Sequence, residues 1–239
     1  NKTAITALGS AISAVNVTAG AVATNLASAS LASAQTAFGE KLHIAITDTT
    51  SNVATNLDTI NSAASSISAV VLSDGSSLSL NSTKAVADTA ALAKISGSYT
   101  ITVTDSFANV QTNATALAAL GSKLSTVNVS ANSIANNLGS GLASVETKLG
   151  AKLQVAITDT ASNVASHLAD LNDSAVSAIT LTNPSTSLSL TAGQVGSYST
   201  ALSKINSYSA TVSGSLSDVV GNKTAITALG SAISAVNVT

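Results

Sequence analysis

The chain has 239 residues, of which 45% are hydrophobic and only 8% are charged, and its formal net charge is −2. Its positive charges are single Lys residues dispersed from Lys2 to Lys223, with no Arg, so the clustered cations that nucleic-acid binding requires are missing. The absence of Cys excludes a disulfide framework and a thiolate metal site, and no apolar run is long enough to predict a membrane span in this segment.

The hydrophobic residues are almost all Ala, Val, Leu and Ile, with two Phe, three Tyr and no Trp or Met. Most of the remaining residues are Ser, Thr, Asn and Gly. Because large aromatic anchors are scarce, we expect the core to be built from small, stiff side chains in a regular arrangement.

The sequence is an internal repeat. Residues 1–18 are identical to residues 222–239, which predicts tandem modules of 221 residues. A weaker repeat lies inside the module, because KLHIAITDTTSNVATNL at 41–57 returns as KLQVAITDTASNVASHL at 152–168. We therefore divide the chain into half-module A (1–112), half-module B (113–221) and the start of the next module (222–239).

Hydrophobic spacings typical of strands and of helices alternate along the chain. The predicted strands, in chain order, are 42–47, 77–80, 99–104, 127–130, 153–158, 177–182, 187–190, 209–213 and 234–239. The predicted helices are 131–149, 159–171, 194–205 and 218–229. Each half-module thus holds about four strand-helix units of ~27 residues, within the range of solenoid repeats.

Strands joined by helices are expected to be parallel, with right-handed crossovers. Several strands place aliphatic residues on one face and Thr, Asn or Ser on the other, as in Ile101-Thr102-Val103-Thr104. This alternation favours helices mainly on one face, since a sheet covered on both faces has continuous apolar runs. The predicted fold class is α/β: a repeat solenoid with one continuous parallel sheet, curved or superhelical because helices are wider than the strand spacing.

The clearest local motif is ITDTTSNV and its repeat ITDTASNV, which place Asp48 and Asp159 where a strand meets a helix. We predict that these Asp residues are helix N-caps. The alternative is a row of calcium ligands, but the glycine-rich nonapeptide that builds such rows is absent, and calcium remains only a possible cofactor.

No catalytic, cofactor-binding or metal-ligating residue is predicted. His43 aligns with Gln154 and His167 with Asn56, so neither imidazole recurs in the other half-module. No His or Cys partner lies near either one, which argues against metal or nucleophilic chemistry and against an enzyme.

The ITDT-x-SNV run, the strand pair that ends in SLSL, and ALxKI together resemble the tandem repeats of very large bacterial surface and secreted proteins, described as adhesin-like or haemolysin-like. The resemblance covers essentially the whole chain. It implies an extracellular, cell-surface location and a structural role in a filament, stalk or surface layer. It supplies no site residue.

Two functions follow. The first is a structural repeat whose partners are other copies of the same module, stacked head to tail with an axial advance of roughly 38 Å per module, from eight principal strands spaced at ~4.8 Å. The alternative is an adhesin surface that binds a polysaccharide or ice through its outward Thr, Ser and Asn side chains.

Overall fold

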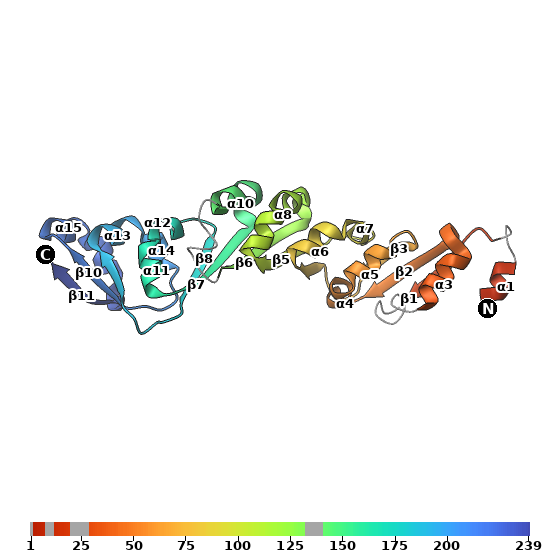
Figure 1. The fold of residues 1–239 in the computed structure, drawn as a ribbon, viewed down its shortest axis with the longest axis horizontal. Helices are drawn as coiled ribbons and strands as arrows, with labels where there is room; N and C mark the ends of the chain where they lie inside the picture. The colour runs from red at the N-terminus through yellow and green to blue at the C-terminus, as the bar shows by residue number, and fades with distance from the viewer. Residues whose placement is uncertain (1, 8–11, 20–28, 132–140) are drawn as a thin grey trace. The chain divides into compact units, whose positions relative to one another are not determined.

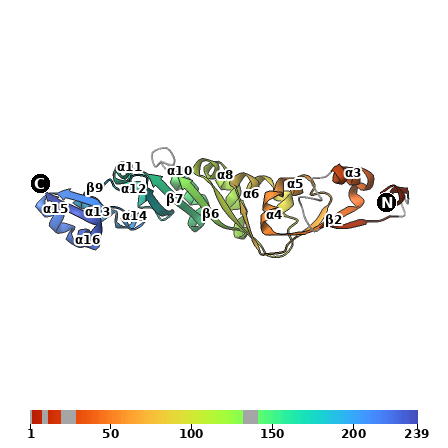
Figure 2. The ribbon, with the colours of Figure 1, turned by 90° about the horizontal axis from the view of Figure 1, so that it is seen from below.

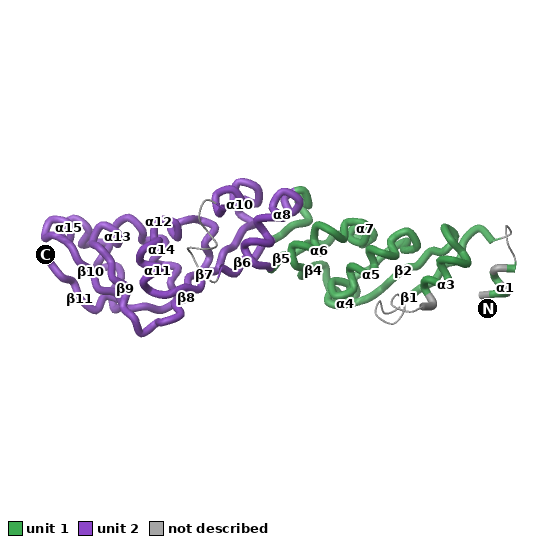
Figure 3. Tube along the Cα trace, viewed as in Figure 1, with its two compact units in different colours: residues 1–104, 119–125 green, residues 105–118, 126–239 purple. Residues whose placement is uncertain are grey.

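The computed structural model describes residues 2–7, 12–19, 29–131 and 141–239. The chain divides into two compact units, one made of residues 1–104 and 119–125 and the other of residues 105–118 and 126–239 (Figure 3).

The elements follow one another as short strands and helices (Figures 1 and 2). From the N-terminus they are α1 (Lys2–Ala7), β1 (Val15–Ala19), α3 (Ala29–Phe38), η2 (Gly39–Lys41), β2 (Leu42–Asp48), α4 (Thr50–Thr55), α5 (Leu57–Ser62), β3 (Ile67–Leu72), β4 (Ser77–Leu80), α6 (Ser82–Ala87), α7 (Thr89–Leu92) and β5 (Thr100–Ser106). They continue with α8 (Phe107–Ala119), η3 (Gly121–Lys123), β6 (Leu124–Ala131), α10 (Gly141–Leu149), η4 (Gly150–Lys152), β7 (Leu153–Asp159), α11 (Ala161–Ser166), α12 (Leu168–Leu171), β8 (Val176–Leu181), β9 (Leu188–Thr191), α13 (Ala192–Ser197), α14 (Ser199–Ser203), β10 (Ala210–Gly214), α15 (Leu216–Gly221), α16 (Lys223–Ala228), η5 (Gly230–Ala232) and β11 (Ile233–Val238).

The strands form three sheets, with the orders β1-β2-β3, β4-β5-β6-β7-β8 and β9-β10-β11. The recorded strand pairs, such as β1 with β2, β7 with β8 and β9 with β10, are parallel. The predicted α/β class with parallel strands is therefore confirmed.

The prediction of one continuous sheet was wrong. A sheet ends after β3 and again after β8, at equivalent places in the two half-modules. Beyond β3, only a single bridge from Val70 to Ile95 continues the pairing, and beyond β8 only the bridge from Ile179 to Ile205 does so. In each half-module a short extra strand begins the next sheet instead: β4 pairs with β5, and β9 pairs with β10.

One face of most strands is buried. Strand β2 alternates Leu42, Ile44 and Ile46 in the core with the exposed side chains His43 and Thr47. Strands β5, β7 and β9 repeat this alternation, and β6 and β8 do so except for one extra residue after their first buried position. Helices cover the buried side; α13 contacts both β9 and β10, and α15 contacts β10 (Figure 1). The core is mostly Leu, Ile, Val and Ala, as the composition predicts.

The helices predicted at 159–171, 194–205 and 218–229 are each two short helices. Their junctions lie at His167, Tyr198 and Asn222, where φ is −105 to −119° and ψ is 13 to 33°. His167 Nδ1 and Asn222 Nδ2 bond to the carbonyl four residues earlier, at 2.9 Å each. Asn113 makes the same bond at 3.0 Å inside the unbroken helix α8, so this bond alone does not cause the junction.

The helix predicted at 131–149 falls partly on residues 132–140, which lie outside the described residues. Its second half is α10, where Leu142, Val145 and Leu149 are buried on one face, as the spacing predicts.

A glycine joins helix to strand at four places. Gly39, Gly121, Gly150 and Gly230 have φ between 52 and 58°, the left-handed region that ends helices. In each case the glycine carbonyl accepts a hydrogen bond from the N–H three residues later, where the strand begins.

We expect Ile157→Ala, which empties a fully buried position in β7, to lower the free energy of unfolding by about 2–5 kcal/mol. Thr158→Ala, next to it on the outward face, is the control and should cost less than about 1 kcal/mol. Urea denaturation of both variants tests the assignment of faces, and equal losses would contradict it.

Candidate functional site

Each strand-to-helix joint with the Asp motif is closed by two side chains. Asp48 Oδ1 accepts hydrogen bonds from the Thr49 N–H at 2.8 Å and from Asn52 Nδ2 at 2.8 Å. The Thr49 hydroxyl then accepts from the Asn52 N–H at 3.2 Å. The N-cap of α4 is therefore Thr49, and the prediction that Asp48 is the cap was wrong by one residue. Asp48 instead holds the cap residue in place.

The same geometry recurs at Asp159. Its Oδ1 accepts from the Thr160 N–H at 2.7 Å and from Asn163 Nδ2 at 2.8 Å, and Thr160 is the N-cap of α11. A third copy, which the sequence analysis missed, lies at Asp105, where Oδ1 accepts from the Ser106 N–H and from Asn109 Nδ2. The signal that could have found it is the shared pattern Asp-Thr/Ser-x-x-Asn.

The turn after the next strand supplies a further cap. Asp74 Oδ1 accepts from the Thr50 N–H at 2.7 Å, and Asn183 Oδ1 accepts from the Ala161 N–H at 2.8 Å. The two turns differ in sequence, yet each places a side-chain Oδ1 within hydrogen-bond distance of the first helical N–H. The contact is therefore the same in both half-modules.

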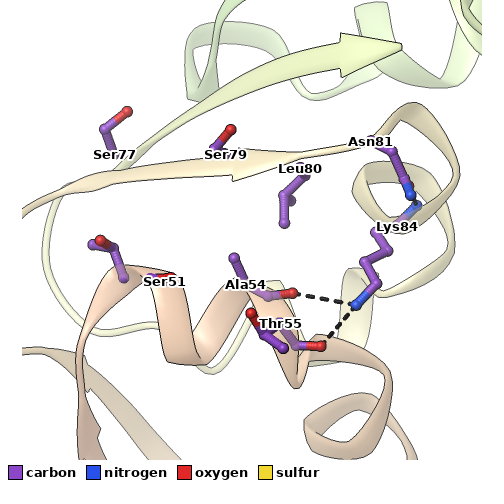
Figure 4. Close-up of a pocket in the computed structure, with 9 residues that line it drawn as sticks. Ser51, Ala54, Thr55, Ser77, Ser79, Leu80, Asn81 and Lys84 are labelled. Atoms are coloured by element: carbon purple, nitrogen blue, oxygen red, sulfur yellow. Dashed lines mark hydrogen bonds between the residues drawn. The ribbon is translucent and has the colours of Figure 1, made fainter. Parts of the chain in front are cut away.

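A shallow groove of about 340 Å³ lies between α4 and β4 (Figure 4). Five hydroxyl side chains line it: Thr50, Ser51, Thr55, Ser77 and Ser79. The equivalent residues of half-module B line a second groove of about 310 Å³ between α11 and β9, with Ser162, Ser166, Ser187 and Ser189. The grooves therefore repeat with the sequence.

The two grooves differ in one side chain. Lys84 donates from Nζ to the carbonyls of Ala54 at 3.3 Å and Thr55 at 2.9 Å (Figure 4). Gln194, at the equivalent position, donates from Nε2 to the Ala165 carbonyl at 3.1 Å. Both side chains cap the carbonyl end of the preceding short helix, so their first role is to join neighbouring helices.

Half-module A has a charged cluster that half-module B lacks. Lys84 forms an ion pair with Asp58 at 3.2 Å, and Asp88 lies nearby as the buried junction of α6 and α7. Burial raises the pKa of Asp88 to about 6, and the neighbouring Asp58 carboxyl adds to the rise. Hydrogen bonding with Asp88, and then with Lys84, lowers the pKa of Asp58. The equivalent residues in half-module B are Ala169, Gln194 and Tyr198, so neither a carboxyl group nor a lysine stands at these positions.

The two histidines lie apart from the grooves. His43 is exposed on the outward face of β2, and His167 Nδ1 faces the Asn163 carbonyl. Within residues 2–7, 12–19, 29–131 and 141–239, no three His, Asp or Glu side chains are close enough together to hold a metal ion. Oδ1 of Asp48 and of Asp159 accepts from N–H donors, an arrangement that supports the helix joint rather than a cation.

None of the helices in the described part of the chain is both long and apolar enough to cross a membrane. Compared with models of known protein families, with curated proteins and with solved structures, the chain matches none of them.

Asp48→Asn keeps the Oδ1 acceptor, so we expect it to lower the free energy of unfolding by less than about 1 kcal/mol. Asp48→Ala removes both hydrogen bonds and should cost about 1–3 kcal/mol. Asp159→Asn and Asp159→Ala provide the matched pair in half-module B. If the Asn and Ala variants lose equal amounts of unfolding free energy in urea denaturation, the negative charge of the Asp residue matters and its acceptor oxygen does not.

The Asp88 pKa predicts a pH dependence. The pKa of Asp88 in the folded state is about 6, whereas the pKa of a free aspartate side chain is 3.8, so between these values the folded state retains a proton that the unfolded state has lost. Stability therefore falls as pH rises through this window, because the folded state binds more protons than the unfolded state. We expect the melting temperature of the wild type to drop by a few degrees between pH 4.5 and pH 7.5.

Asp88→Asn should remove most of that drop and raise the melting temperature at pH 7.5. The control is Asp170→Asn, which changes an exposed carboxylate of half-module B and should leave the pH profile intact. If the melting temperature of Asp88→Asn falls with pH as it does in the wild type, Asp88 is not the group that causes the pH dependence.

Proposed function

We propose that this chain is a structural repeat region of an extracellular bacterial filament, stalk or surface layer, in which modules stack head to tail. Its strand-helix units form a parallel solenoid with helices mainly on one face, and the array coils because helices are wider than the strand spacing. The extracellular location rests on the resemblance of the repeats to those of large bacterial surface proteins.

The observation that carries the proposal is that the two half-modules share hydrogen bonds position by position. The Ser73 N–H donates to the Asp48 carbonyl at 2.8 Å, and the Thr182 N–H donates to the Asp159 carbonyl at 2.9 Å. Asn61 Oδ1 accepts from the Ala91 N–H as Asn172 Oδ1 accepts from the Ala201 N–H. A unit that repeats its contacts in this way supports a stacked array.

Burial at equivalent strands supports the stacking. In β6, which pairs with β7, Val127 and Val129 are at most 1% exposed. In β11, the equivalent Val236 and Val238 are 42% and 55% exposed. In the repeat it is the unit following β6 that pairs with this strand, and stacked modules would bury Val236 and Val238 in the same way.

A second candidate is the adhesin surface, and the repeated grooves favour it. Hydroxyl groups arranged at the same positions in both half-modules could bond to a polysaccharide. We favour the structural role, because Lys84 and Gln194 in those grooves already bond to backbone carbonyls of the preceding helix.

Electron microscopy and sedimentation of the purified chain over a range of concentrations test the proposal. We expect linear assemblies that lengthen with concentration, with an axial repeat of roughly 38 Å or less. A monomer at every concentration would contradict it. Binding of monomers to a polysaccharide panel, lost in a Ser51→Ala/Ser79→Ala variant but kept in Thr158→Ala, would favour the adhesin instead.

A further inference from the structure

The two breaks between sheets are crossed by helix contacts. We call the end of the first sheet after β3 sheet break A, and the end of the second sheet after β8 sheet break B. At each break one bridge links the strands, from Val70 to Ile95 or from Ile179 to Ile205. Helix α5 contacts α7 across break A, and α12 contacts α14 across break B. Because the strand pairing is reduced to one bridge, the helices hold much of each break together.

Both breaks share one uncharged hydrogen bond, and break A has charged contacts in addition. Asn61 Oδ1 accepts from the Ala91 N–H at 3.1 Å across break A, and the equivalent pair crosses break B at 3.0 Å. At break A, Lys84 of α6 also forms the ion pair with Asp58 of α5 and donates to the Thr55 carbonyl of α4. The two breaks thus provide a matched comparison of one backbone arrangement with and without this charged cluster.

Asp88 lies where the helices cross break A. It is 4% exposed, and its Oδ2 has no hydrogen-bond donor among the described residues. The charged groups that face it are Asp58, from the other side of the break, and Lys84, from its own side. Asp88 and Asp58 are hydrogen-bonded to each other, which requires a proton on one of them, because an ionised carboxylate can only accept.

The proton belongs on Asp88. Burial and the neighbouring Asp58 carboxyl raise the pKa of Asp88 to about 6, although the Lys84 charge opposes the rise. The Asp58 side chain is 68% exposed, and hydrogen bonding with Asp88 and Lys84 lowers its pKa. Protonated Asp88 therefore donates to ionised Asp58 and ties the α6–α7 junction to α5.

Loss of this proton turns the tie into a repulsion. Two ionised carboxylates would then face each other, one of them buried with an unpaired oxygen, which is unfavourable. Opening break A exposes Asp88 to water and relieves that cost. The closed form therefore binds the proton more tightly than the open form, so closure is favoured most below pH 3.8 and loses this advantage as pH rises through about 6.

We propose that sheet break A is a pH-sensitive hinge, in which a proton shared by Asp88 and Asp58 holds the two sides together in acid and its loss lets them open locally at neutral pH. Sheet break B, with Ala169, Gln194 and Tyr198 at the equivalent positions, does not respond. The hinge lies inside one half-module, so it operates whether or not modules stack head to tail.

Amide hydrogen exchange, followed by NMR, tests the hinge. The Val70 and Ser96 amides donate across break A at 2.8 Å each, and the Ile179 and Asn206 amides donate across break B at 2.9 and 3.1 Å. The ratio of their exchange rates in one sample cancels the intrinsic effect of pH on exchange. We expect the rate at break A relative to break B to rise about tenfold between pH 5 and pH 7.5.

Three variants identify the group responsible. Asp88→Asn keeps a donor toward Asp58 without a titrating proton, so the ratio should stay low at every pH. Lys84→Gln, which installs the residue of half-module B, removes the charge that favours ionised Asp88, so the rise should move to higher pH. Asp170→Asn, an exposed carboxylate of half-module B, is the control and should behave as the wild type. Melting curves establish that each variant folds, and Lys84→Gln retains the test if Asp88→Asn does not.

A ratio that stays constant between pH 5 and pH 7.5 in the wild type would overturn the hinge. So would an equal rise at the Ile44 amide, which donates to the Ser66 carbonyl at 2.8 Å, because the first sheet would then be opening as well. A rise confined to Val70 and Ser96 and absent from Asp88→Asn supports it. Sedimentation tests the filament role separately, so either proposal can fail without the other.

Discussion

The structure depends on the burial of one aliphatic face of each parallel strand beneath short helices. The core contains few aromatic rings, so it is held together by many contacts among Val, Ile, Leu and Ala side chains. Small side chains let strands and helices repeat at regular spacings. A single large anchor in one unit would break that regularity, because its neighbours could not accommodate it equally.

The joints between strands and helices convert this layered core into a repeat. Asp48, Asp105 and Asp159 hold the first helical turn through Oδ1, and a glycine in the left-handed region returns the chain to the next strand. Both kinds of joint, the Asp motif and the glycine turn, depend on hydrogen bonds between residues that are close together in the sequence. The direction of each helix is therefore set within a few residues of the strand that it covers.

The half-modules keep a common backbone while their side-chain chemistry differs. Lys84 and Gln194 both cap a preceding helix, but only Lys84 brings a charge, and with it the carboxyl pair of Asp58 and Asp88. We therefore expect the stability of this half-module alone to vary with pH, while the shared contacts remain. The two half-modules thus differ in side-chain charge while they keep the same backbone contacts.

The sequence alone predicted most of the strands, their parallel direction, their buried faces and the two-fold internal repeat, because alternation and repetition are local patterns, seen for example around Ile44 and Ile157. Strands β1 and β3 were not among the predicted strands. Only the tertiary structure decided where the sheets break, because that depends on whether β3 or β4 pairs with the next segment. The tertiary structure also showed that Thr49, not Asp48, caps α4. It further showed that Asp58 lies close enough to Asp88 to raise the pKa of Asp88. These contacts join residues that lie close together only after folding, so no local pattern contains them.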